Sequence, residues 1–351
     1  MVIIARVLLP ILIAAAIMAG LPAAAETQLR MLGQFLPTAK QYPVEKATLD
    51  AIDADEGLDI KVIANVYKAM GLKTSDGLRL VRAGTFHVVA IQIGTASRDD
   101  AFLEGIDLIG VSTDMTSLRE AVEAYRDVLD ARVQQKFNAK ALALWPFGPQ
   151  VFYCNQEINS VEDLKGLKVR SFTPSMSALL ESFGATAVTL TFGEVYPALQ
   201  RKVASCGVTS PTSGNTGKWP EVTTHQIPLS VSGSVQGYFA NLDWWNGLTD
   251  DQRSGVQAAF KTLEDGLWET AVNLNADALA CNTGQDSCRD HQKFSMTLVE
   301  VSADDLARVK KAAETVVLPA WIERCEATYP GCTEVWNETV GKARGIRAVA
   351  K

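Results

Sequence analysis

Apolar residues recur with two different spacings in the first half of the chain. Short runs rich in branched apolar residues predict four strands, at Gln28–Gly33, Ile60–Tyr67, Phe86–Ile93 and Ala141–Trp145. Between the first two, the helical spacing of Pro43–Asp55 predicts an amphipathic helix. Strands that alternate with helix-length segments pair in parallel and are covered by helices. An α/β fold is therefore predicted.

Two helix starts are marked in the second half of the chain. Thr249–Gln252 and Ser302–Asp305 each have the form of a capping box, in which a hydroxyl side chain and an acid or amide three residues later satisfy each other's free backbone N–H groups. Apolar residues follow each box at helical spacing. We assign these apolar stripes to core faces and not to binding sites.

The first residues have the order of an export leader. One charge, Arg6, precedes the apolar run Val7–Leu21, and the small residues Ala23–Ala25 follow. This order predicts a secretory signal peptide at residues 1–25. An uncleaved membrane anchor is the alternative, because Val7–Ala25 is long enough to span a bilayer, but the alanine-rich end favours cleavage. No later apolar run reaches that length, so no stable membrane insertion of the mature chain is expected.

Composition and charge narrow the class of protein. The 351 residues are 47% hydrophobic and 21% charged, with only 13 prolines and 25 glycines, which is typical of a globular chain of about two domains. Lysine and arginine number 33 against 40 acids, a formal charge of −7. Because nucleic-acid binding needs basic clusters that neutralise phosphates, nucleic acid is not expected as a partner.

The chain has six cysteines, an even number that suits an oxidising compartment: Cys154, Cys206, Cys281, Cys288, Cys325 and Cys332. The last four form two pairs, each separated by six residues, which favours two local bonds and leaves Cys154 and Cys206 for a long-range bond. Cross-pairing among the last four remains open. A metal site is the competing interpretation, but the spacing is longer than zinc sites use and the histidines are scattered. No metal is predicted.

Signatures of catalysis and of cofactor binding are absent from the sequence. It contains no GxGxxG, GxxxxGK[ST], HExxH or GxSxG motif. With all cysteines expected to be oxidised, covalent catalysis has no visible nucleophile and base. We therefore expect no cofactor and no enzymatic activity, and a secreted α/β hydrolase or lyase is kept only as a weaker alternative.

The most informative stretch lies between Gly148 and Pro211. In it, Glu162-Asp-Leu-Lys-Gly-Leu-Lys-Val-Arg170 is followed by Phe183-Gly-Ala185 and then by Phe192-Gly-Glu-Val-Tyr-Pro-Ala-Leu-Gln200. Ser160 is predicted to open a short helical turn that Gly166 closes before a strand ending near Arg170. That strand end is well placed to face a crevice between domains, although a surface arginine on an edge strand is the alternative.

In order and spacing, these strings resemble the solute-binding proteins of tripartite ATP-independent periplasmic (TRAP) transporters, the C4-dicarboxylate-binding family. The resemblance covers about 50 residues, and the rest of the chain is compatible in length. It implies a periplasmic-binding-protein-like fold, two α/β domains joined by a hinge with a ligand cleft between them. It also implies a periplasmic receptor that binds a small organic acid and delivers it to integral-membrane permease subunits. A sensory module for the same solutes is the alternative.

The resemblance also implies roles for individual residues. In the family, the arginine that ends the first motif pairs with the substrate carboxylate, and here that residue is Arg170. Phe192 would line the pocket. Gln150 occupies the position where some relatives have a second arginine, so a second carboxylate anchor is in doubt. Cys206 stands where relatives have an aspartate, and Thr209 and Ser210 become candidate hydroxyl contacts.

Aromatic residues near the same region would suit an acid with an apolar or aromatic body. The candidates are Trp145 and Trp219, with core packing as the alternative explanation. From the first domain, Gln34 would face the cleft, because ligands bind beyond the carboxyl ends of strands.

Family boundaries predict two crossovers between the domains, near Gly148 and near Val235. The expected ranges are 26–147 with 235–276 for the first domain and 148–234 with 277–335 for the second. Residues 336–351 would form a C-terminal helix or tail.

Overall fold

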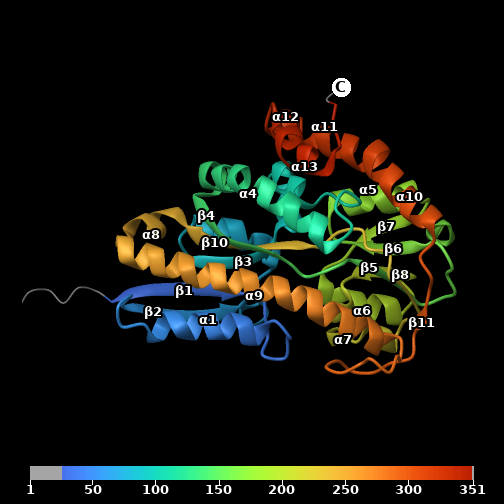
Figure 1. Cartoon of the computed structure of the whole chain (residues 1–351), viewed down its shortest axis with the longest axis horizontal. Helices are drawn as coiled ribbons and strands as arrows, with labels where there is room; N and C mark the ends of the chain where they lie inside the picture. Colours follow the sequence, from blue (N-terminus) through green and yellow to red (C-terminus); the bar gives the residue numbers. More distant parts are fainter. Residues whose placement is uncertain (1–25, 350–351) are drawn as a thin grey trace, which may run out of the picture.

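The computed structural model describes residues 26–349, and the expected leader at residues 1–25 lies outside them. Its strands form two mixed sheets (Figure 1). The five-stranded first sheet has the order β2 (Ile60–Val66), β1 (Thr27–Gly33), β3 (Val88–Gln92), β10 (Val235–Asn241), β4 (Ala139–Pro146). The six-stranded second sheet has the order β11 (Thr297–Leu298), β9 (His225–Ile227), β5 (Val151–Cys154), β8 (Cys206–Thr209), β6 (Lys168–Ser171), β7 (Thr186–Thr189). The predicted two-domain α/β fold is confirmed.

Helices cover the sheets and connect their strands. In chain order they are α1 (Tyr42–Ala54), α2 (Tyr67–Met70), α3 (Gly77–Arg82), α4 (Met115–Phe137), α5 (Pro174–Ser182), α6 (Phe192–Gln200), α7 (Pro211–Thr216), α8 (Leu242–Gly247), α9 (Asp250–Asn282), α10 (Ala303–Ala312), α11 (Leu318–Thr328), α12 (Cys332–Trp336) and α13 (Lys342–Arg344). Two π-helical turns, η6 (Ala313–Val317) and η7 (Asn337–Gly341), link the last ones. None of the helices in residues 26–349 has the length and apolar character that crossing a bilayer requires.

Most of the elements that local sequence signals predicted are present in the structure. The four predicted strands correspond to β1, β2, β3 and β4, and the predicted amphipathic helix is α1. Thr249 and Ser302 form the capping boxes that begin α9 and α10. Ser160 caps the 3₁₀ turn η4 (Val161–Leu164), and Gly166 ends it with a positive φ of 79° before β6.

The strand directions bring one edge of each sheet together. β1 and β3 are parallel, and β10 is antiparallel to both β3 and β4, so the carboxyl ends of β1, β3 and β4 share an edge. In the second sheet Val151, which begins β5, pairs with Thr209, which ends β8. Only residues 147–150 connect β4 to β5, and five residue steps reach at most roughly 17 Å. The carboxyl ends of parallel strands in both sheets therefore face the same junction, where α/β proteins bind ligands.

Two chain segments run antiparallel through this junction. The backbone N–H of Gly148 donates to the carbonyl of Gly233, and that of Gln150 donates to Ser232, at 3.1 and 2.8 Å. Gly148 has a φ of 115°, and a Cβ added there would lie 2.0 Å from the Asn275 side chain. Only glycine fits this crossing, because the backbone conformation and the close approach both exclude a side chain. Helix α9 makes the third connection and runs along both sheets (Figure 1).

The C-terminal helices pack differently from the predicted domain ranges. Leu318, Trp321 and Cys325, together with Trp336, belong to the hydrophobic core of the first sheet, which the α4 side chains also join. Figure 1 shows α11, α12 and α13 lying over α4. The predicted second range, 277–335, therefore includes a segment that packs on the first core. The division into ranges stays a proposal, and the packing moves its last boundary to about Leu318.

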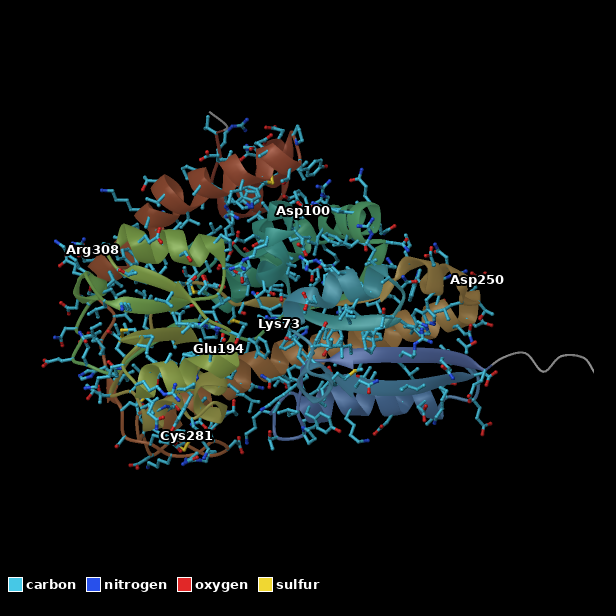
Figure 2. All side chains as sticks on the ribbon, turned by 180° about the vertical axis from the view of Figure 1, so that it is seen from behind. Lys73, Asp100, Glu194, Asp250, Cys281 and Arg308 are labelled. Carbon is cyan, nitrogen blue, oxygen red and sulfur yellow. A yellow bond between two sulfur atoms is a disulfide. The ribbon has the colours of Figure 1, made fainter. Side chains whose placement is uncertain are left out.

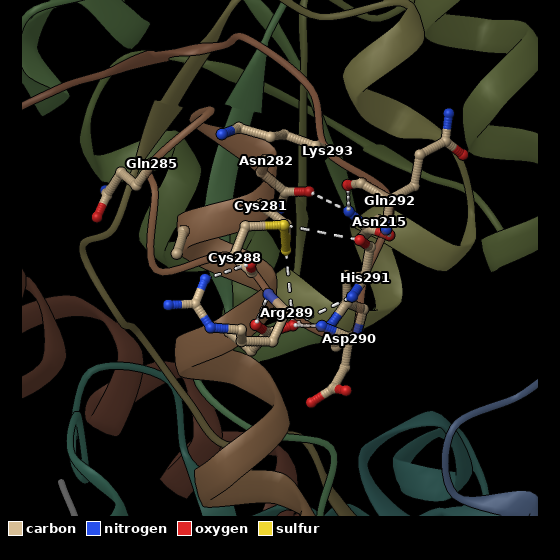
Figure 3. Close-up of a disulfide and its surroundings, with 12 residues drawn as sticks. Asn215, Cys281, Asn282, Gln285, Cys288, Arg289, Asp290, His291, Gln292 and Lys293 are labelled. Atoms are coloured by element: carbon tan, nitrogen blue, oxygen red, sulfur yellow. Dashed lines mark hydrogen bonds and ion pairs between the residues drawn. A yellow bond between two sulfur atoms is a disulfide. The ribbon is translucent and has the colours of Figure 1, made fainter.

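The six cysteines form three bonds, Cys154–Cys206, Cys281–Cys288 and Cys325–Cys332. This is the arrangement that the spacing favoured over cross-pairing. The first bond joins paired residues of the neighbouring strands β5 and β8. Figure 3 shows the second, which closes a loop after α9 beside Asn215, whose side chain donates to Asn282 and to the carbonyl of Gln292, both at 2.8 Å.

A buried acid connects the helices of the two sheets. Glu104, in the 3₁₀ segment η3 (Ala101–Asp107), is 2% exposed. Its Oε1 accepts the backbone N–H of Ser175 in α5 at 2.8 Å, and its Oε2 accepts Arg324 Nη2 of α11 at 2.9 Å. The carboxylate therefore bridges the α5 N-terminus and the C-terminal segment.

Glu104→Gln is expected to lower the free energy of unfolding by about 1–2 kcal/mol, because the amide keeps one acceptor but loses the charged bond to the partly exposed Arg324. Urea denaturation measures this. The matched control is Glu120→Gln, since Glu120 also pairs with an arginine, Arg344, but is largely exposed, and the change should stay within about 0.5 kcal/mol. Equal effects of the two substitutions would contradict the bridging role of Glu104.

A second buried acid lies under the first sheet. Glu45 of α1 is 4% exposed, and Tyr238 Oη donates to its Oε2 at 2.7 Å. Burial raises the pKa of Glu45 to about 7, and the hydrogen bond from Tyr238 only partly opposes this. Because the folded pKa lies above the unfolded value, the stabilising contribution of Glu45 is complete below about pH 4.5 and is lost as the pH rises through 7.

Glu45→Gln is expected to remove this pH dependence, since the amide stays neutral and still accepts from Tyr238. Relative to the parent, the variant should gain on the order of 2–3 kcal/mol in unfolding free energy between pH 4 and pH 8. Urea denaturation at several pH values measures the difference, with Glu56→Gln, at an exposed position, as the control. A constant difference between variant and parent across that range would refute the raised pKa.

Candidate functional site

Arg170 is buried at the end of β6 where the two sheets meet. It is 5% exposed; its Nε donates to the carbonyl of Leu190 at 3.2 Å and its Nη1 to the carbonyl of Val208 at 2.6 Å. No ion pair within residues 26–349 includes it, and its Nη2 has no hydrogen-bond partner there. Burial without a carboxylate lowers the pKa of Arg170 to about 9. Because this buried positive charge has only two carbonyl acceptors and no counter-ion within residues 26–349, the site favours the binding of an anion.

Aromatic rings surround the guanidinium. Its central carbon lies 4.6 Å from the ring centroid of Phe172 and 5.9 Å from that of Trp219. Trp219, in the 3₁₀ turn η5 (Trp219–Glu221), is fully buried beside Gly207, the residue that pairs with Arg170 across the sheet. A Cβ at Gly207 would lie 2.8 Å from the Trp219 ring. The glycine thus lets the ring approach Arg170.

Phe192 extends the same aromatic wall toward solvent. Its ring stacks on Trp219 with centroids 5.5 Å apart, and 43% of its surface is exposed. It begins α6, where Thr191 and Glu194 form a capping box. An exposed large apolar side chain beside a buried arginine suits the wall of a ligand site.

The two hydroxyl candidates differ in what they already bind. Ser210 is fully buried, and its Oγ caps α7 by accepting the backbone N–H of Ser213 at 3.2 Å while donating to the Ser213 hydroxyl at 2.9 Å. Its hydroxyl is therefore engaged in helix capping. Thr209 ends β8, is 5% exposed, and its hydroxyl has no hydrogen-bond partner within residues 26–349. Of the two, only Thr209 has a hydroxyl left for a ligand.

Gln150 lies in the segment 147–150 that connects the two sheets, and its side chain bonds to the backbone of that segment. It is 2% exposed, and its Nε2 donates to the carbonyl of Gly148 at 2.8 Å. It offers no charge to a second carboxylate. One N–H of its Nε2 is used within the junction, whereas the Nη2 of Arg170 has no partner within residues 26–349.

The first sheet contributes a mixed aromatic and amide surface. Trp145 ends β4 fully buried, with the rings of Phe35 and Phe147 at centroid distances of 5.5 and 5.0 Å. Gln34 follows β1, and its Nε2 donates to Gln236 Oε1 at 3.1 Å. The structure thus brings Gln34 and Trp145 to the same sheet edge, while Arg170, Phe192 and Trp219 cluster at the facing edge.

Sequence reasoning missed Gln236 and Asp107. Gln236 reaches this edge because β10 inserts between β3 and β4 from far along the chain. Asp107 ends η3, and its Oδ2 accepts Ser232 Oγ at 2.8 Å and the Val235 N–H at 3.1 Å in the crossing segment. Burial raises the pKa of Asp107 to about 6, against these hydrogen bonds. No local sequence signal marks either residue.

Two grooves are also present in the part of the chain that the structure describes. One groove of about 550 Å³ is lined by Arg119, Trp268 and Val272 with neighbours on α4 and α9. A second, of about 380 Å³, is lined by Lys73, Arg79 and Arg98, among others. Within residues 26–349, no group of three or more histidine, cysteine, aspartate or glutamate side chains could hold a metal ion.

Comparison with known proteins gives one consistent family. The profile of the bacterial extracellular solute-binding proteins, family 7, matches residues 67–323. The chain is 24% identical over 260 residues to the sialic acid-binding periplasmic protein of Vibrio cholerae, covering 73% of this chain and 80% of that protein. It is 27% identical over 186 residues to the C4-dicarboxylate-binding periplasmic protein of Rhodobacter capsulatus, covering 53% of this chain and 52% of that protein.

Among solved structures, a TRAP solute-binding protein from a marine metagenome, specific for pyroglutamate, superposes with a TM-score of 0.77 at 18% identity. The superposition covers 90% of this chain and 99% of that one. A likeness at this identity establishes the shared fold.

Proposed function

Because the chain belongs to family 7 of the bacterial extracellular solute-binding proteins, we propose that it is a TRAP-type receptor that binds a small organic acid between its two sheets. The observation that carries this proposal is Arg170, a buried guanidinium with no acidic partner within residues 26–349, at the edge where the sheets meet. A guanidinium binds a carboxylate with two parallel hydrogen bonds, and exclusion of water strengthens the pair.

The surroundings of Arg170 favour an acid with an apolar or flat body. Trp219 and Phe192 line one side, and Trp145 with Phe35 and Phe147 lines the other sheet edge. The ligands named for the three relatives described above, sialic acid, C4-dicarboxylates and pyroglutamate, each carry a carboxylate. One carboxylate held by Arg170 is therefore the shared element that we carry over to this chain.

The proposal also states that the protein binds the organic acid without converting it. The protein would release the acid to integral-membrane permease subunits, and it would act in the periplasm after export. Its junction, crossed by residues 147–150 and 231–235 and by α9, would act as the hinge on which such a receptor opens and closes. We propose no turnover of the bound acid.

Thermal-shift titration tests the proposal. A panel of organic acids, each paired with its neutral carboxamide, is added to the protein, since a ligand that binds only the folded state raises the unfolding temperature. We expect at least one acid to raise it and its carboxamide to have no effect. Equal shifts for acid and carboxamide, or no shift from any acid after refolding from denaturant to remove a co-purified ligand, would contradict an acid receptor.

A further inference from the structure

The indole N–H of Trp145 is a buried donor without an acceptor. Trp145 is fully buried, and its Nε1 has no hydrogen-bond partner within residues 26–349. Three other buried tryptophans each donate to a backbone carbonyl, Trp268 to Leu144, Trp321 to Ala101 and Trp336 to Gly105, at 2.8–3.0 Å. An unpartnered buried donor costs about 1–3 kcal/mol, so the Trp145 N–H needs an acceptor that residues 26–349 do not supply.

The strand register places Trp145 in a row of polar side chains. Gln236 of β10 pairs directly with Trp145 of β4 on one side and with Gln92 of β3 on the other. Directly opposite residues in antiparallel strands project from the same face of a sheet. Trp145, Gln236 and Gln92 therefore line one face at the edge where the carboxyl ends of β3 and β4 meet the second sheet.

The three glutamines around this row are uncharged and already engaged with one another or with backbone. Gln34 Nε2 donates to Gln236 Oε1 at 3.1 Å, and Gln236 Nε2 donates to the carbonyl of Ser234 at 2.7 Å. Gln92 Oε1 accepts the backbone N–H of Thr95 at 2.7 Å. These bonds hold the amides in place. The Nε2 of the half-buried Gln92 has no partner within residues 26–349, and the Trp145 N–H is the fully buried donor of the row that has none.

The three residues of the row, Trp145, Gln236 and Gln92, are all uncharged. The basic residues near the end of β3, Lys73 and Arg98, are exposed and line the 380 Å³ groove, which Thr95 beside Gln92 also lines (Figure 2 labels Lys73). A second carboxylate buried against the row would have only neutral amides and an indole as neighbours. Burying an unpaired charge is far more costly than burying a neutral acceptor that receives one hydrogen bond.

We propose that the Trp145 N–H selects a ligand that carries, besides the carboxylate bound by Arg170, one uncharged hydrogen-bond acceptor such as a lactam or amide carbonyl. This inference rests on the proposed function and narrows it to monocarboxylates with a neutral polar group, excluding dicarboxylates. Phe35 and Phe147 beside Trp145 would cover the apolar part of the same end of the ligand.

Calorimetric titration with three matched probes tests the proposal: pyroglutamate, which has a lactam carbonyl; cyclopentanecarboxylate, which lacks it; and glutarate, which has a second carboxylate. The parent protein is expected to bind pyroglutamate at least 10-fold more tightly than either analogue. Trp145→Phe keeps the aromatic ring but loses the N–H, and should weaken pyroglutamate binding about 10-fold while leaving cyclopentanecarboxylate within 2-fold. Trp244→Phe, on α8, is the control and should change neither.

The outcomes separate the two proposals. Tighter binding of glutarate, equal loss for both ring acids in Trp145→Phe, or binding of another panel acid without a preference for pyroglutamate would overturn the inference and leave the acid receptor standing. Absence of binding by every acid would overturn the proposed function itself. The probe ranking uses the unmodified protein, so it decides the question even if Trp145→Phe does not fold.

Discussion

Replacing Arg170 with methionine is expected to weaken binding of the organic acid by roughly 30-fold to several thousand-fold, because truncating one partner of a buried charge pair costs about 2–5 kcal/mol. Methionine keeps the length of the aliphatic stem between Phe172 and Trp219 but offers no donor. Since burial without a carboxylate already disfavours the guanidinium, the ligand-free variant should unfold no earlier than the parent. Calorimetry with the acid found by thermal shift measures the affinity.

Two further substitutions make this result specific to the site. Arg170→Lys keeps a positive charge but loses the planar fork, so its affinity should fall between those of the parent and of Arg170→Met. Arg308→Ala removes an exposed arginine on α10, whose partners are Glu162 and Asp304, and should leave affinity unchanged (Figure 2). Unchanged binding in Arg170→Met would remove Arg170 from the site.

Replacing both Cys154 and Cys206 with serine is expected to lower the free energy of unfolding by about 4 kcal/mol. The bond links residues separated by 52 positions, and closing a loop of that length restricts the unfolded chain by about this amount in the chain-entropy description. Both residues are fully buried at paired positions of β5 and β8, so each serine hydroxyl also loses access to water. Urea denaturation under non-reducing conditions measures the change.

The bond between Cys281 and Cys288 provides the comparison. It spans only 7 positions, for which the same relation gives about 2.4 kcal/mol, so the serine pair at these positions should be the more stable of the two variants. Mass mapping of the oxidised parent should first confirm the two pairings. A smaller loss for the Cys154 and Cys206 pair than for the Cys281 and Cys288 pair would contradict the loop-length explanation.

The elements that the sequence predicted well are those whose signals are local. The apolar runs of β1 to β4, the capping residues Thr249 and Ser302 and the turn closed by Gly166 all act within a few residues of where they stand. The insertion of β10 between β3 and β4 depends on pairing between strands that are far apart in the sequence, and no short pattern encodes it. The same holds for the C-terminal helices, whose stripe of Trp321 and Trp336 indicates burial but not which core receives it.

The residues of the candidate site also differ in whether a sequence motif or only long-range pairing identifies them. The motif ending in Arg170 identified the residue that is buried without an acidic partner in the described part of the chain, because the family resemblance carried long-range information. Gln236 and Asp107 were missed because they reach the junction only through sheet order and crossing segments. The predicted contact Ser210 has its hydroxyl engaged in the cap of α7, a local role that a pattern ending in Ser-Pro could have indicated.

A crystal structure of the protein with its organic acid tests the central claim most directly. The account predicts one ligand carboxylate within hydrogen-bond distance of Arg170, between the edges of the two sheets, with the ligand body against Trp219 and Phe192. An acid bound elsewhere, with Arg170 still bonded only to the carbonyls of Leu190 and Val208, would contradict it.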